Sequence, residues 1–287
     1  MKHYILYNPL AANGSTVEKA KALDTIIDGE CELIDITALK SYQDFFANIE
    51  SDDIVVLCGG DGTINRFVND TDGVDIQNDI LYYPLGTGND FLRDVEKDAS
   101  VPFSIKEYIK DLPTVEVKGN TYRFINNVGF GIDGYCCEVG DELKKTTDKP
   151  VNYTSIAIKG LLFHFKPKNA TVCIDGKEYS YKKVWIAPTM KGRYYGGGMM
   201  PTPDQDRTAE NGELSLMLFH GSSKLKTLMV FPSLFKGEHV KHTKIIAIHK
   251  GHEISVKFDK PCALQIDGET ILGVESYKAT SKVKAKV

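Results

Sequence analysis

Glycines, a carboxylate and a threonine stand together where an apolar run of the sequence ends. Residues 54–59 read as a buried strand, Gly60-Asp61-Gly62-Thr63 follows, and residues 63–69 are helix-like. Glycines let the backbone turn its amides toward an oxyanion, and a helix start adds unpaired amides and a positive dipole end. The spacing matches neither a P-loop nor a dinucleotide fingerprint. It predicts a phosphate-binding loop, with a plain capped turn at Asp61 or Thr63 as the alternative.

Asp61 sharpens this prediction. A carboxylate beside bound polyphosphate is repulsive unless a divalent cation lies between them or nearby amides offset its charge. Magnesium-nucleotide is therefore the expected guest, and Asp61 would position Mg²⁺ on ATP.

Two further loops repeat the arrangement of strand, turn and helix. Residues 80–83 lead into Leu85-Gly86-Thr87-Gly88-Asn89-Asp90, and residues 4–7 lead through Asn8-Pro9 to a helical stretch at 16–27. Successive strand-to-helix turns place their loops at the carboxyl ends of parallel strands, where open α/β sheets bind ligands. We expect the three loops to surround one nucleotide. Thr63, Thr87 and Asn89 would hold its phosphates, and Arg93 is either a charge clamp or an exposed helix cation.

These motifs resemble the diacylglycerol kinase catalytic family, which includes soluble bacterial lipid kinases and sphingosine kinases and is related to NAD kinase. The resemblance extends from Asn8 to Glu269. It rests on Asn8-Pro9, Gly59-Gly60-Asp61-Gly62-Thr63-Ile64-Asn65, Leu85-Gly86-Thr87-Gly88-Asn89-Asp90-Phe91 with Arg93, Gly196-Gly197-Gly198, and Asp267-Gly268-Glu269.

The resemblance implies an α/β fold of two domains with ATP between them. Residues 1–113 would form a parallel-sheet domain like that of phosphofructokinase and NAD kinase, and residues 114–274 an antiparallel β-sandwich. The tail, residues 275–287, would return to the first domain or fray. The residues implied to bind nucleotide are Asn8, Pro9, Leu10, Ala11, Ala12, Thr37, Gly59, Gly60, Asp61, Gly62, Thr63, Ile64, Asn65, Arg66, Thr87 and Asn89.

The sequence itself supports this division near residue 113. Before it, strand-like and helix-like runs alternate, as in a parallel sheet. After it, β-like runs dominate, separated by turns such as Asp175-Gly176 and interrupted by helical stretches at 134–145 and 153–163.

The implied catalytic base is Glu269, with Asp267 assisting. Phosphorylation of a lipid hydroxyl needs a base near that oxygen. Asp-Gly is also a strong hairpin signal, and Ile174-Asp175-Gly176 provides a second copy of it in a segment that we interpret as a plain turn.

Two substitutions depart from the family pattern. Arg66 stands where many relatives have glutamate. A structural magnesium site of the bacterial relatives would map onto Thr208, Asn211 and Glu213, where the neutral Asn211 replaces an aspartate and weakens attraction for the cation.

Charge and composition add an expectation about the lipid partner. Residues 1–120 carry a net charge of −12 and residues 121–287 carry +8. A basic half would be attracted to an anionic membrane surface, with ordinary solvated lysines as the alternative. Six cysteines without metal-ligand spacing indicate reduced thiols, and we expect a cytoplasmic protein that meets lipid peripherally. No motif favours nucleic acid.

The predicted reaction is transfer of the ATP γ-phosphoryl group to a hydroxyl of diacylglycerol or a similar lipid. An NAD-kinase-like small-molecule kinase shares Gly-Gly-Asp-Gly-Thr, and a non-catalytic nucleotide- or lipid-binding regulator would suit Arg66 and Asn211. The acceptor lipid, the acyl preference and the oligomeric state, a homodimer included, stay open.

Overall fold

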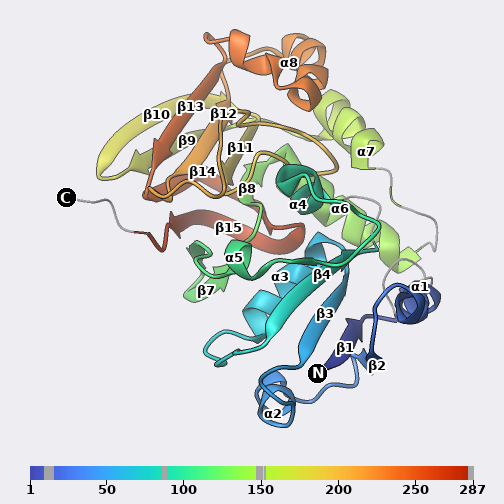
Figure 1. The fold of residues 1–287 in the computed structure, drawn as a ribbon. Coiled ribbons are helices and arrows are strands. Elements are labelled where there is room, and N and C mark those ends of the chain that lie inside the picture. Colours follow the sequence, from blue (N-terminus) through green and yellow to red (C-terminus); the bar gives the residue numbers. More distant parts are fainter. Residues whose placement is uncertain (10–15, 86–88, 147–150, 152, 284–287) are drawn as a thin grey trace. The chain divides into compact units, whose positions relative to one another are not determined.

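The chain folds as two compact units, Met1–Asp111 and Leu112–Val287, in the computed structural model (Figure 1). The structure describes residues 1–9, 16–85, 89–146, 151 and 153–283. The division falls within two residues of the boundary expected from the sequence. Each unit is described by itself below.

The first unit is a five-stranded α/β sheet in the order β2-β1-β3-β4-β5. The first four strands are parallel, and β5 pairs antiparallel with β4. Its strands are β1 (Lys2–Tyr7), β2 (Glu30–Asp35), β3 (Ile54–Gly59), β4 (Asp79–Pro84) and β5 (Phe103–Ser104). Its helices are α1 (Thr16–Ala22), η2 (Leu23–Thr25), α2 (Tyr42–Ala47), α3 (Asp61–Asp70), α4 (Asp90–Val95) and α5 (Lys106–Ile109).

The sequence of β3 explains its central place. Five consecutive residues from Val55 are buried, as expected for a parallel strand covered on both faces. The helix that follows, α3, buries Ile64, Phe67 and Val68, which are spaced three and four residues apart and so share one side of the helix.

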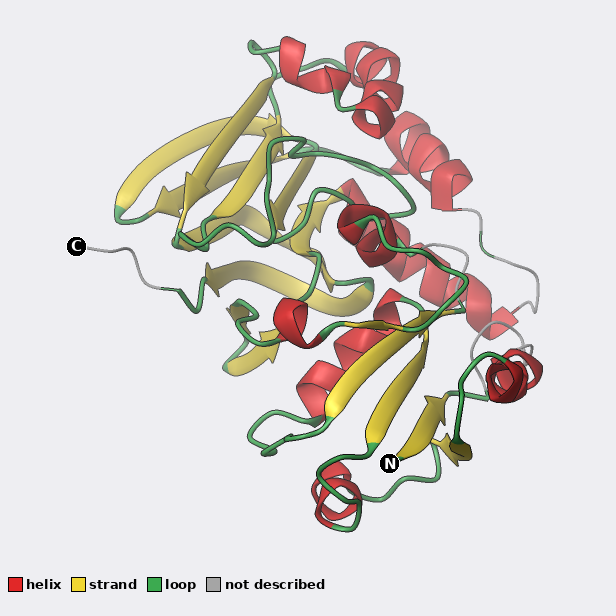
Figure 2. Cartoon of the chain, viewed as in Figure 1, coloured by secondary structure: helices red, strands yellow, loops and turns green. Residues whose placement is uncertain are grey.

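The second unit is an antiparallel β-sandwich with helical insertions (Figure 2). One path of strands runs β13-β12-β11-β8-β14-β15-β6-β7, and β9 and β10 branch from β14. The strands are β6 (Thr114–Val117), β7 (Asn120–Arg123), β8 (Asn127–Gly131), β9 (Lys168–Ile174), β10 (Lys177–Val184), β11 (Ile186–Met190), β12 (Leu214–Phe219), β13 (Ile246–Gly251), β14 (Glu253–Ile266) and β15 (Glu269–Thr280). The helical segments are α6 (Ile132–Thr146), α7 (Tyr153–Lys159), η3 (Gly160–His164), α8 (Lys224–Val230), η4 (Phe231–Lys236) and η5 (Glu238–Lys241).

The long strand β14 belongs to both layers of the sandwich. Its residues 254–258 pair with β9, and its residues 264–266 pair with β8. Between them the register with β15 shifts near Lys257 and Cys262, and the strand continues through the shift. Side chains from both layers, including Phe130, Val172, Leu216 and Phe258, share one core.

The C-terminal tail extends this sandwich through its described residues. β15 runs to Thr280 between β14 and β6, and Ser281 Oγ donates to the Gly212 carbonyl at 2.7 Å. The described part of the tail therefore lies in the second unit, and not in the first as the resemblance implied. All six cysteines are unpaired thiols, as predicted.

Candidate active site

The glycine-rich loop after β3 has a conformation that only its small residues allow. Gly59 ends the strand, and a Cβ there would overlap the Thr63 side chain. Gly60 is the N-cap of α3 and has extended backbone, and its carbonyl accepts from the amides of Thr63 and Ile64 at 2.9 and 3.3 Å. The amides of Asp61 and Gly62 thus precede the first hydrogen bonds of the helix, at its positive dipole end. This is an anion-binding geometry.

Strand order places this loop at the switch point of the sheet. The chain leaves β1 toward β2 on one side and later leaves β3 toward β4 on the other, so adjacent strands β1 and β3 lead into diverging connections. Ligands of open α/β sheets bind at the carboxyl ends of such a strand pair. Asn8 and Pro9 follow β1 there, opposite Gly60 after β3.

Asp61 ties the first glycine-rich loop to the second. Its two carboxylate oxygens accept from the amides of Asp90 and Phe91 at 2.8 and 3.0 Å, at the beginning of α4. The carboxylate therefore helps fix the segment around Asn89. The role of Asp61 in holding magnesium on ATP stays a prediction.

A buried phenol reinforces the same connection. Tyr82 has no exposed surface, and its hydroxyl donates to the Gly59 carbonyl at 2.9 Å with Asn89 Oδ1 at 3.4 Å. Burial raises the pKa of Tyr82, so the hydroxyl keeps its proton and serves as a donor. Gly59 and Asn89, both predicted at the site, are thus held near each other.

The other predicted nucleotide contacts differ in exposure. Ile64 and Asn65 are buried on the inner side of α3, while Arg66 and Thr37 are exposed. Thr37 donates through both its amide and its hydroxyl to Asp35 Oδ1, at 2.8 and 2.7 Å, in a turn that ends β2. Arg93 lies on the exposed side of α4. Leu10, Ala11, Ala12 and Thr87 lie outside the described residues.

In the second unit, Asp267 and Gly268 form a hairpin turn between β14 and β15. Their φ angles are 46° and 94°, as the tightest hairpins require. The Asp267 carboxylate accepts from the amides of Ile125, Asn126 and Asn127 at 2.6, 2.8 and 2.9 Å. Asp267 thus holds the turn against the beginning of β8.

Glu269 is the exposed residue at which β15 begins. The turn before it is fixed from a second side, because Gln265 Oε1 accepts from the Gly268 amide at 2.9 Å. An exposed carboxylate on a rigid turn can accept a proton from a bound hydroxyl.

Three buried side chains around this hairpin were not predicted from the sequence. Arg207 donates to the Ile125 carbonyl and to Asn126 Oδ1, at 3.1 and 2.8 Å. Asp133, on α6, lies 3.5 Å from Gln265 Nε2, and burial raises its pKa to about 7. The third side chain is Gln265. It was the only one of the three with a sequence signal, because it is a polar residue within an apolar strand that ends at the turn.

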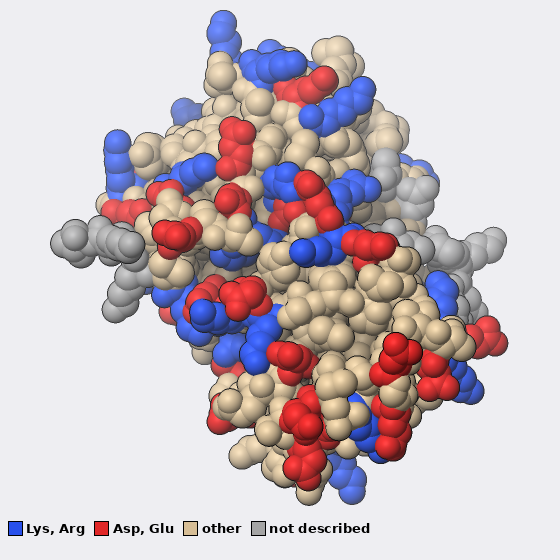
Figure 3. Space-filling model, in the orientation of Figure 1, with Lys and Arg blue, Asp and Glu red and all other residues tan. Residues whose placement is uncertain are grey.

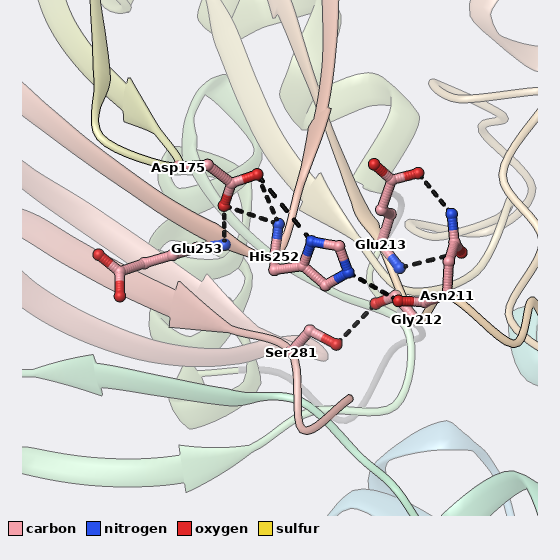
Figure 4. A network of polar contacts seen from close by, with 7 residues as sticks. All are labelled: Asp175, Asn211, Gly212, Glu213, His252, Glu253 and Ser281. Atoms are coloured by element: carbon pink, nitrogen blue, oxygen red, sulfur yellow. Dashed lines mark hydrogen bonds and ion pairs between the residues drawn. The ribbon is translucent and has the colours of Figure 1, made fainter. Parts of the chain in front are cut away.

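Residues of the predicted structural magnesium site form hydrogen bonds with one another and with His252 (Figure 4). Asn211 Nδ2 donates to Glu213 Oε2 at 2.7 Å, and the Asn211 carbonyl accepts from His252 Nε2 at 2.7 Å. The Glu213 carbonyl accepts from Gln205 at 2.9 Å, and Thr208 donates to Asp206. That Thr208, Asn211 and Glu213 hold a structural magnesium ion stays a prediction. Across the described residues, no three His, Cys, Asp or Glu side chains form a metal-binding group.

A cavity of about 700 Å³ lies beside the hairpin strands within the second unit. Apolar, basic and acidic residues mix in its wall, which includes Phe165, Lys168, Lys260, Leu272, Glu138 and Asp259. Leu272 is three residues beyond Glu269 on β15.

Comparison with known proteins agrees with the arrangement of these elements. The profile described as the diacylglycerol kinase catalytic domain matches residues 2–116, and the profile described as the YegS C-terminal NAD kinase beta sandwich-like domain matches residues 126–280. The chain belongs to the diacylglycerol kinase catalytic family.

Relatives of this family resemble the chain along most of its length. The diacylglycerol kinase of Mycobacterium tuberculosis (strain ATCC 25618 / H37Rv) is 24% identical over 82% of this chain and 79% of its own. A candidate lipid kinase of Staphylococcus aureus (strain Newman) is 28% identical over 77% of this chain and 72% of its own. A solved structure of a candidate diacylglycerol kinase from Bacillus anthracis str. Sterne shares the fold, with a TM-score of 0.65, 17% identity, and coverage of 98% and 94% of the two chains.

Within the described part of the chain, no helix is long and apolar enough to cross a membrane.

Proposed function

We propose that this chain is an ATP-dependent lipid kinase that phosphorylates a hydroxyl of diacylglycerol or a similar lipid. The observation that carries the proposal is the Asp61 bridge, which joins two glycine-rich loops at the switch point of the first sheet. Membership of the diacylglycerol kinase catalytic family supports a kinase reaction, and the lipid acceptor is our inference from that membership.

The nucleotide would be held by the first unit. Amides at the start of α3, with the side chains of Thr63 and Asn89, would receive the phosphate oxygens. Magnesium bound with ATP would offset the charge that develops on the transferred phosphoryl group. Asp61 lies within this loop, and its carboxylate is our candidate for orienting that ion. No step depends on the separate structural magnesium ion.

The acceptor would be activated by Glu269. The lipid hydroxyl oxygen forms a bond to the γ-phosphorus, the bond from that phosphorus to the β–γ bridging oxygen breaks, and ADP leaves. The hydroxyl proton passes to the Glu269 carboxylate. Asp267 acts on the turn, because its carboxylate is engaged by three backbone amides. Lipid products imply work at a membrane surface, where the protein would bind peripherally.

Transfer of labelled γ-phosphate from ATP tests the proposal directly. We would offer diacylglycerol in mixed micelles and, in parallel, NAD, because the second unit matches a sandwich named after NAD kinase. Magnesium-dependent formation of phosphatidic acid is expected. Phosphorylation of NAD alone would replace the proposal with the small-molecule kinase, and absence of both products would favour the regulator.

A further inference from the structure

The helical insertions of the second unit expose a group of large apolar side chains. We call it the apolar face, and it comprises Ile158, Leu162, Phe163, Leu225 and Met229. Phe163, Leu225 and Met229 are 72%, 68% and 67% exposed. Apolar side chains grouped in this way, unlike single ones scattered over a surface, are typical of an interaction site. Ile158 and Leu162 are four residues apart, as are Leu225 and Met229, so each pair forms a ridge along one side of its segment.

The opposite sides of these segments are anchored in one core. Ile156, Leu161, Val230, Phe231 and Leu234 are buried together with Trp185. The face is therefore the outer side of firmly packed segments. The two ridges are neighbours, because α8 contacts η3 and Lys224 Nζ donates to the Leu162 carbonyl at 3.0 Å (Figure 1).

The segments that carry the apolar face are rich in lysine. Residues 153–168 and 222–244, which form it, contain eight lysines and a single acidic residue, Glu238. Figure 3 shows Lys or Arg side chains, with acidic ones among them, near the place that α8 has in Figure 1. The lysines are Lys159, Lys166, Lys168, Lys224, Lys226, Lys236, Lys241 and Lys244.

We propose that the apolar face docks on a lipid bilayer that contains anionic lipids. Exposed aromatic and aliphatic side chains would enter the boundary between headgroups and acyl chains, and the lysines would meet anionic headgroups. Protein interfaces are depleted in lysine, and a second copy on the same face would bring lysines against lysines. The charge thus favours a membrane over a different protein and over a second copy of this chain. The inference rests on the proposed function only in that the acceptor is a membrane lipid.

The position of the face agrees with this role. η3 ends at His164, which is also the first of five consecutive residues, 164–168, in the wall of the cavity beside β15. Docking through Phe163 would therefore bring the bilayer next to that cavity.

Vesicle sedimentation tests docking without any turnover. Vesicles of phosphatidylcholine, with or without phosphatidylglycerol, would be mixed with the full chain in the absence of ATP. We expect strong binding to the anionic vesicles only. Replacing Phe163→Ser, Leu225→Ser and Met229→Ser together should weaken that binding roughly a hundredfold. Replacing Lys226→Glu and Lys236→Glu should weaken vesicle binding at least roughly tenfold. Added salt should weaken the binding of the wild type, because it screens the attraction between lysines and anionic headgroups.

Matched controls carry the same chemical changes elsewhere. Ile26, Val101 and Ile248 are also exposed apolar residues, and their triple change to serine should leave vesicle binding as in the wild type. Lys40→Glu with Lys97→Glu reverses the same amount of charge in the first unit and should have much less effect than the Lys226 and Lys236 pair.

Phosphorylation of a short-chain diacylglycerol dispersed in detergent separates docking from catalysis. Face variants that lose vesicle binding should keep this activity. Failure of the wild type to bind anionic vesicles, equal binding to neutral vesicles, or unchanged binding of the triple face variant would each overturn the proposal. The proposal would also be overturned if the wild type were a dimer and the substitutions in the apolar face dissociated it. A wild type that docks but phosphorylates no lipid would keep the docking surface and remove only the lipid-kinase function.

Discussion

The second unit contains two Asp-Gly hairpins that differ in what they support. In both, aspartate and glycine have positive φ: 46° and 94° at Asp267-Gly268, and 47° and 83° at Asp175-Gly176. In both, the aspartate carboxylate reaches backbone amides of another segment, three for Asp267 and two, those of His252 and Glu253, for Asp175. The turn chemistry is therefore structural in each case.

The difference lies in the next residue and in the support behind the turn. Glu269 follows the first turn, and Lys177 follows the second. Gln265 accepts a hydrogen bond from the Gly268 amide through Oε1, and its Nε2 donates to Asp133 Oδ2. Glu269 is therefore the carboxylate that we propose as the base, and Asp267 holds the turn from which it extends.

Glu269→Gln should have the largest effect of any change at the two hairpins. Loss of a general base is expected to lower turnover by roughly 10²- to 10⁴-fold, with little change in stability because the side chain is exposed. Initial rates of phosphatidic acid formation measure it. Glu275→Gln, an exposed carboxylate on the same strand, is the control, and equal rates for both variants would remove Glu269 from the mechanism.

Asp267→Ala should destabilise the second unit more than Asp175→Ala. Three amides lose a charged acceptor in the first case and two more exposed amides in the second, so we expect about 3 and about 1 kcal/mol. Urea unfolding followed through Trp185, the only tryptophan, reports this unit. Similar losses in the two variants would show that the hairpins are equivalent supports.

Asp133 makes the first hairpin sensitive to pH. Its pKa in the folded protein is raised by burial to about 7, from an ordinary value near 3.8. A raised pKa means that its contribution to stability is present at low pH and is lost as the pH rises toward 7. The slope should be about 1.4 kcal/mol per pH unit within that window.

Asp133→Asn isolates this contribution. Subtracting its unfolding free energy from that of the wild type between pH 5 and pH 8 should give a difference that falls to about pH 7 and then levels off. A difference that does not change with pH would mean that the carboxyl does not titrate in this range.

Gly268→Ala and Gly176→Ala should cost about the same, roughly 1 kcal/mol each. Both glycines have positive φ, and an added Cβ would contact nothing within 4 Å, so only backbone strain is introduced. Thermal unfolding of the two variants is the measurement. A much larger loss at Gly268 would show that the Gln265 contact tolerates no strain.

Local patterns in the sequence predicted both hairpins, the glycine-rich turn between β3 and α3, and the two-part fold. Asp-Gly between strands and Gly-rich turns after apolar runs depend on nearby residues, so one chain was enough to find them. The capping of α4 by Asp61 was not predictable, because it joins residues that are distant in sequence. The same holds for Arg207 against Asn126.

Two other features were missed for different reasons. β14 continues through Asp259, Lys260 and Pro261 with a shifted register, which these residue types do not indicate. The helical turns at 224–241 include Pro232, and the apolar side chains on both sides of these turns hide any simple periodicity.

The place of β15 in the sandwich has a consequence for biosynthesis. β15 lies between β14 and β6, although β6 leaves the ribosome far earlier. The first unit has all of its strands within residues 2–104, so it can fold while the second is still being made. The second unit must wait for β15, with β6 unpaired on that side and apolar core residues uncovered. Chaperone binding to nascent chains should therefore be greatest between the synthesis of β6 and that of β15.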